Sequence, residues 1–193
     1  METVQDITDK RVGEYIYTYA GIKFWPLDPR PEEICIGDIA HALSLLCRYN
    51  GHVPFHYSVA HHSLYVSDVM EKQYGTLGGL CGLMHDAAEA YIGDMTRPLK
   101  RTPSLKVFSD IEDNLLKVIF AKFQIPMMDY KHADNSVLMM EKQQLGKQDQ
   151  VWHVNDYHDL QEDGVIIAIT PMHPREAEHL FLETFNRLMM GVS

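Results

Sequence analysis

The sequence has few cysteines, no long apolar run and no excess of basic charge, and each shortage excludes a class of protein. Among 193 residues there are three cysteines, at positions 35, 47 and 81, and none form a C-x-x-C pair. This usage predicts buried thiols in a reducing cytoplasm. No run of about 18 apolar residues occurs, so we expect no membrane span. The N-terminal METVQDITDK lacks a signal-peptide core, and the net charge of -10 argues against nucleic-acid binding.

What the chain does contain is typical of one globular domain over residues 1–193. Its composition is 46% hydrophobic and 23% charged, without repeats or low-complexity tracts. The aromatic and β-branched stretch at residues 14–24, with Gly21 at a turn, predicts a small β-hairpin. Three prolines in the following residues 26–31 predict an extended loop.

Apolar residues recur at helical spacing over most of the remaining chain. We expect helices over residues 39–49, 58–70, 77–91, 104–123, 129–145 and 174–190, with Asp38, Ser58 and Ser104 as N-caps. Residues 93–103 read as a loop and residues 165–169 as a short strand. The predicted fold class is therefore all-α, a helical bundle with a small N-terminal β-hairpin. Such bundles build metal sites from residues on facing helices.

Polar residues interrupt the apolar helix predicted over residues 77–91. His85 and Asp86 are adjacent there, and such groups are costly to bury unless they are paired or bound to a metal. Glu89 follows one turn later, so all three side chains can border one cavity. Because the flanking residues are apolar, little of this helix is available to face solvent.

Two other predicted helices also carry polar residues among apolar ones. His61 and His62 lie in the helix over residues 58–70, and Asp134 lies among apolar neighbours in the helix over 129–145. Imidazole and carboxylate together suit a divalent metal of intermediate softness. The combination of three helices is more informative than any single pair.

Read along the chain as H…HD…D, these residues resemble the HD-domain phosphohydrolases. The resemblance covers residues 34–145, the core of the domain, and includes a Ser-Val-Ala-x-His pattern that ends at His62. Further matches are Arg48-Tyr49, His85-Asp86-Ala87-Ala88-Glu89, Gly93-Asp94, Pro98-Leu99-Lys100 and Ala133-Asp134. The pattern is similar to the small bacterial and phage branch, which includes 5′-deoxynucleotidases and phage dATP triphosphohydrolases.

The resemblance implies a role for each matched residue. One divalent ion (cobalt, manganese, zinc or magnesium) would be held by His62, His85, Asp86 and Asp134. The attacking water would be positioned or deprotonated by Glu89 and Asp94, which leaves open a second metal there. Phosphate oxygens would be bound by Arg48 and Lys100, and the base would stack on Tyr49 and Pro98. These roles meet the usual demands of phosphoryl transfer, which are a water activator, a base and cations.

The resemblance also implies attack at the α-phosphate of a 2′-deoxynucleotide. The basic stretch with Arg97, Lys100 and Arg101 could hold a polyphosphate tail, which favours a dATP-type triphosphohydrolase releasing deoxynucleoside and triphosphate. The alternative is a 5′-deoxynucleotidase acting on monophosphates. Gly51 lies near the place where adenine-selective members carry bulk, which argues against strict adenine selection.

Alternatives to this enzyme class are a guanosine-alarmone hydrolase and a non-catalytic nucleotide sensor. The first resembles H-D-x-x-E-D, and here Ala90 follows Glu89. The second is disfavoured because every expected catalytic position is filled. The resemblance further implies a homo-oligomer with a small-molecule substrate. The cysteine usage, the net charge and the lack of a long apolar run predict a cytoplasmic protein (in the host cytoplasm if phage-encoded) with neither nucleic-acid nor membrane partners.

Overall fold

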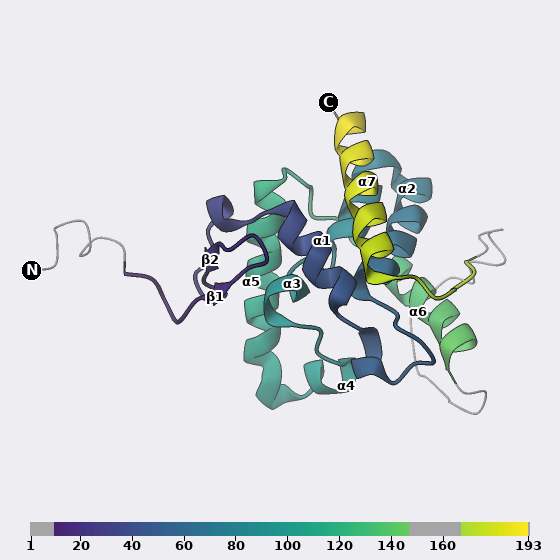
Figure 1. Ribbon diagram of the computed structural model, residues 1–193, viewed down its shortest axis with the longest axis horizontal. Helices are drawn as coiled ribbons and strands as arrows, with labels where there is room; N and C mark the ends of the chain where they lie inside the picture. Colours follow the sequence, from purple (N-terminus) through teal and green to yellow (C-terminus); the bar gives the residue numbers. More distant parts are fainter. Residues whose placement is uncertain (1–9, 147–166, 193) are drawn as a thin grey trace, which may run out of the picture.

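The computed structural model describes residues 10–146 and 167–192, and these are mostly helical (Figure 1). One antiparallel hairpin pairs β1 (Ile16–Tyr17) with β2 (Lys23–Phe24). The predicted all-α class with an N-terminal hairpin is thus confirmed at this level. In the described ranges, no helix is long and apolar enough to cross a membrane.

The helices surround one principal core, to which the hairpin contributes Phe24. They are α1 (Ile36–Leu45), α2 (Val59–Met84), α3 (Glu89–Ile92), α4 (Arg97–Lys100), α5 (Lys106–Lys122), α6 (Lys131–Leu145) and α7 (Pro174–Val192). Short 3-10 turns occupy Pro31–Glu33, Arg48–Gly51 and Pro103–Leu105. Helix α7 packs along α1 and α2, and α6 packs on α2 (Figure 1).

Helix α2 reverses direction at Gly75, so that its two halves pack against each other. Gly75 has a φ of 69°, in the left-handed region that glycine tolerates best. The returning half passes very close to the first: a Cβ built on Gly78 would lie 2.5 Å from the Met70 carbonyl oxygen, and one on Gly82 would lie 2.7 Å from that of Val66. This return brings the C-terminal end of α2 back beside its N-terminal end.

Two predicted helices end earlier than expected. Helix α1 stops at Leu45 because Leu46 and Cys47 are extended, with ψ values of 114° and 123°, and Tyr49 and Asn50 then take positive φ values of 58° and 50° within the following 3-10 turn. The helix expected over residues 77–91 is divided: α2 ends at Met84, a turn covers residues 85–88, and α3 follows. Within the expected loop over residues 93–103, the short helix α4 forms instead.

Of the three predicted N-caps, only Ser58 caps its helix in the structure. Ser58 caps α2 as expected by accepting a hydrogen bond from the His61 amide. Asp38 is not a cap: α1 begins two residues earlier, and the buried Asp38 carboxylate accepts a hydrogen bond from the Ala20 amide at 2.7 Å. Ser104 lies in a 3-10 turn before α5.

The ends of the last two helices are close to the prediction. Helix α6 begins at Lys131, whose amide donates to the Asp129 carboxylate, and α7 begins at Pro174 as predicted. Of the strand expected over residues 165–169, positions 165 and 166 lie outside the described residues, and 167–169 form no strand.

The close return of α2 predicts a different cost for alanine at two glycines. Gly82→Ala should lower the free energy of unfolding by about 1–3 kcal/mol, because the new Cβ collides with backbone. Gly37→Ala in α1 is the control, since its Cβ would meet Cys35 Sγ at 3.7 Å, an ordinary contact. Urea unfolding measures both variants, and a Gly82→Ala protein as stable as wild type would contradict this packing.

Candidate metal centre

Three of the four predicted metal ligands converge in the structure. His62 near the start of α2, His85 just after its end and Asp134 on α6 offer ligand atoms that all lie within 4.8 Å of one another. The return of α2 therefore has a direct consequence, because it places the two imidazole rings 5.3 Å apart between centroids. Asp86, the fourth predicted ligand, lies beside the group with its Oδ2 at 3.1 Å from His85 Nε2.

Both imidazoles are anchored through Nδ1. His85 Nδ1 lies 2.7 Å from the carbonyl oxygen of Gly82, and His62 Nδ1 lies 2.5 Å from Glu141 Oε1. Both Nε2 atoms are buried, and neither makes a hydrogen bond to any of the described residues, although His62 Nε2 lies 3.2 Å from Asp134 Oδ1 as an ion pair. Two imidazole nitrogens and carboxylate oxygens directed at one point fit a divalent first-row metal.

Glu141, on α6, is a buried residue of the site that was not predicted from the sequence. Its Oε1 accepts hydrogen bonds from His62 and from the Tyr57 hydroxyl at 2.8 Å. Its Oε2 accepts from Arg48 at 3.2 Å and from the Tyr49 hydroxyl. The spacing offered a signal, because Glu141 follows Asp134 by seven residues and therefore lies two turns along the same helix face.

A second cluster surrounds Glu89 at the start of α3. Lys100 Nζ donates to Glu89 Oε1 at 2.9 Å and to Glu112 Oε1 at 2.7 Å. Lys100 thus holds the predicted general base in place, whereas the family resemblance implied that it binds phosphate. Glu112 was not predicted, since it resembles the other charged residues on the exposed face of α5.

The remaining predicted residues lie around these clusters. Arg48 Nη1 is 3.6 Å from Asp86 Oδ2, so this cation bridges Asp86 and Glu141. Pro98 is exposed on α4 and Asp94 is partly buried. Beside Pro98, Arg97 Nη2 donates to Asp134 Oδ2 at 3.3 Å, which brings a residue of the predicted basic loop to the metal ligands.

Burial, together with neighbouring negative charge, raises the pKa of several carboxyl groups in this second cluster. Burial raises the pKa of Glu89, and Asp86 and Asp94 raise it further, although Lys100 opposes them. Burial also raises the pKa of Asp94 and Glu112.

At His62 and at Glu141 beside it, neighbouring charges outweigh burial in setting the pKa. Burial and Arg48 lower the pKa of His62, but Glu141 and Asp134 outweigh them and raise it to about 9. Burial likewise opposes ionisation of Glu141, yet Arg48 and His62 hold the pKa of that carboxyl well below its usual range.

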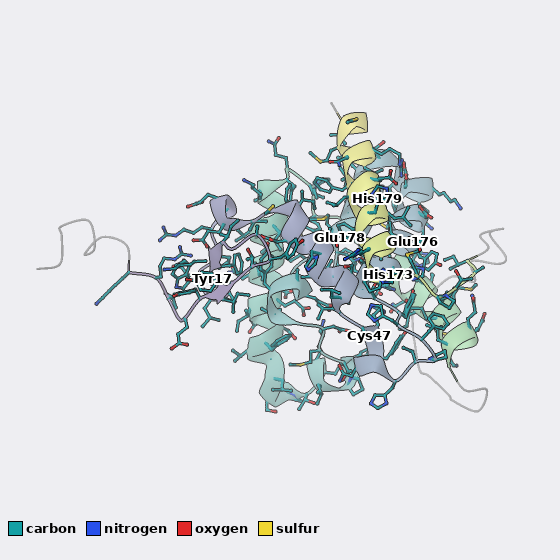
Figure 2. All side chains as sticks on the ribbon, viewed as in Figure 1. Tyr17, Cys47, His173, Glu176, Glu178 and His179 are labelled. Atoms are coloured by element: carbon teal, nitrogen blue, oxygen red, sulfur yellow. The ribbon has the colours of Figure 1, made fainter. Side chains whose placement is uncertain are left out.

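A cavity of about 340 Å³ adjoins the Glu89 side of the site. It lies between the hairpin, α1 and α3, and its wall includes Tyr17, Tyr19 and His41. His41 stacks on Tyr19 and pairs with Glu178 at 3.1 Å, which links the hairpin to α7 across α1. In Figure 2, the label Tyr17 marks the hairpin and the label Glu178 marks a residue of α7.

The fold and this centre define a helical protein with a cluster of two buried histidines and a partly exposed aspartate. The chain is 33% identical over 178 residues to the uncharacterized protein YfdR of Escherichia coli K12, an alignment that covers 90% of this chain and 95% of YfdR. The chain therefore belongs to the same family as YfdR. It is also 37% identical over 105 residues to an uncharacterized protein of Rhodobacter capsulatus, about half of each chain. No family profile matches it.

The geometry predicts which histidines hold a metal. His62→Ala and His85→Ala should each weaken Co²⁺ binding by more than about 100-fold, because removing a ligand should cost more than removing an outer-shell partner. His61→Ala is the matched control, since its Nε2 pairs with the Tyr65 hydroxyl instead. Metal content after dialysis against Co²⁺ measures all three, and loss of metal from the His61 variant alone would contradict the assignment.

Proposed function

We propose that this protein is a divalent-metal-dependent phosphohydrolase of 2′-deoxynucleotides that attacks the α-phosphate. The observation that carries the proposal is the convergence of His62, His85 and Asp134, with a buried carboxylate at Glu89 in the adjoining cluster. When bound, the metal would supply Lewis-acid chemistry, neutralising phosphate charge and lowering the pKa of water.

The chain's own residues suit the other parts of this reaction. Glu89 is 2% exposed, and its Oε2 has no hydrogen-bond partner within the part of the chain that the structure describes. Its raised pKa brings its basicity closer to neutral pH, where a general base is most effective. Lys100 fixes the carboxylate through Oε1 and leaves Oε2 available to accept the proton of an attacking water.

Two arginines of the basic stretch, one of which contacts Asp134, support a triphosphate rather than a monophosphate substrate. The side chain of Arg97 is 38% exposed although it contacts Asp134 and Asn135, so it can exchange that contact for a phosphate oxygen. Arg101 follows on the exposed end of α4. Guanidinium groups bind phosphate oxygens in bidentate geometry, and a deoxynucleoside triphosphate would offer them a polyphosphate tail.

Product analysis tests the proposal directly. Protein loaded separately with cobalt, manganese, zinc or magnesium is incubated with the four deoxynucleotides as mono- and triphosphates, with ribonucleotides as controls. We expect deoxynucleoside plus triphosphate. Deoxynucleoside plus phosphate from monophosphates alone would instead show a 5′-deoxynucleotidase, and absence of turnover by metal-loaded protein would favour the sensor.

Glu89→Gln should lower kcat by about 10²–10⁴-fold, the usual contribution of a general base, while metal content stays unchanged. Glu112→Gln is the matched control, because it removes the other carboxylate that binds Lys100 and should retain most activity. Both are measured by product release and metal analysis. A Glu89→Gln enzyme with wild-type kcat would exclude the role of base.

The raised pKa of Glu89 also predicts a pH dependence with a definite sign. A base acts only when deprotonated, so kcat should fall as the pH drops through the pKa of Glu89, at a pH above the usual carboxyl range. The pH profile of kcat, with metal saturating at every pH, measures this. An acid limb at the pKa of an ordinary carboxyl would contradict it.

A further inference from the structure

Glu141 connects three separate segments of the chain at the metal centre. Its donors come from the 3-10 turn (Arg48 and Tyr49), from the residue before the N-cap of α2 (Tyr57) and from α2 itself (His62). The residue is completely buried. Burying a carboxylate is costly unless it is paired and hydrogen-bonded, and here each oxygen is bound by two donors.

We propose that Glu141 is a positioning residue. It fixes the ring of His62 so that Nε2 faces the metal, and it fixes the position of the Arg48 guanidinium relative to that ring. This role rests on the metal site of the proposed function. It goes beyond that function because it says that Glu141 determines which tautomer His62 adopts and where the side chain of Arg48 lies.

The hydrogen bond to Nδ1 determines which nitrogen of His62 can bind a metal. A carboxylate can only accept, so Nδ1 carries a proton in its bond to Glu141 Oε1. The lone pair of the neutral ring is then on Nε2, the atom that lies 3.2 Å from Asp134 Oδ1. Carboxylate–histidine pairs of this kind orient metal-ligating imidazoles and increase their basicity.

The second oxygen of Glu141 fixes the orientation of the Arg48 guanidinium. Oε2 binds Nη2 of Arg48, while Nη1 of the same guanidinium lies 3.6 Å from Asp86 Oδ2. The planar guanidinium is rigid, so fixing one nitrogen determines the direction of the other. One carboxylate thereby sets the distance between a metal ligand and the buried cation beside it.

Co²⁺ titration tests the role with a readout other than turnover. Glu141→Gln should bind Co²⁺ about 10–100-fold more weakly, the usual effect of losing an outer-shell partner, with an altered visible spectrum. The control Asp38→Asn alters another buried carboxylate, which accepts a hydrogen bond from the Ala20 amide and not from a metal ligand, and it should keep wild-type affinity and spectrum. Unchanged affinity and spectrum in Glu141→Gln would overturn the proposal.

A second measurement needs no variant and therefore does not depend on the folding of Glu141→Gln. In the wild-type protein loaded with Zn²⁺, long-range ¹H–¹⁵N spectra should show the His62 proton on Nδ1 and the metal on Nε2. The reverse assignment would overturn the role of Glu141 while leaving the metal site intact. Failure of the wild-type protein to bind either Co²⁺ or Zn²⁺ would instead overturn the proposed function, and this role with it.

Discussion

The close packing of the two halves of α2 is the constraint on which the centre depends. Gly78 lies against Met70 and Gly82 against Val66, and these contacts define an antiparallel register. About one turn beyond the contact between Gly82 and Val66, the same pairing of the two halves places His62 beside His85. A side chain at either glycine would push the halves apart, and the two imidazoles would no longer converge on one point.

Helix α6 completes the centre by crossing this paired helix with two acidic residues on one face. Asp134 faces the Nε2 side of His62 and Glu141 faces its Nδ1 side. The ring is therefore held between two carboxylates from one helix, seven residues apart. Because α6 packs directly on α2, the orientation of the ring depends on tertiary packing and not on the local conformation of α2.

Much of this arrangement could be predicted from the sequence, and the limits have physical causes. The apolar neighbours of His62, His85 and Asp134 in the sequence predicted that these residues are buried in one common site, and the structure brings them together. The role of Glu141 was less accessible, because a single acidic residue near the end of a helix usually faces solvent. Its donors are 79 to 93 residues away in the chain, beyond any local pattern.

The balance of charge explains why a dication suits this centre. Among the described residues, six carboxylates gather there with three cations: Asp86, Glu89, Asp94, Glu112, Asp134 and Glu141 with Arg48, Arg97 and Lys100. The protein relieves the excess in part with protons, since the pKa values of Glu89, Asp94 and Glu112 are raised and that of His62 is about 9. A proton on His62 Nε2 occupies the direction in which a metal would bind. A divalent ion replacing it would bring more positive charge to the same point, so metal binding should release protons.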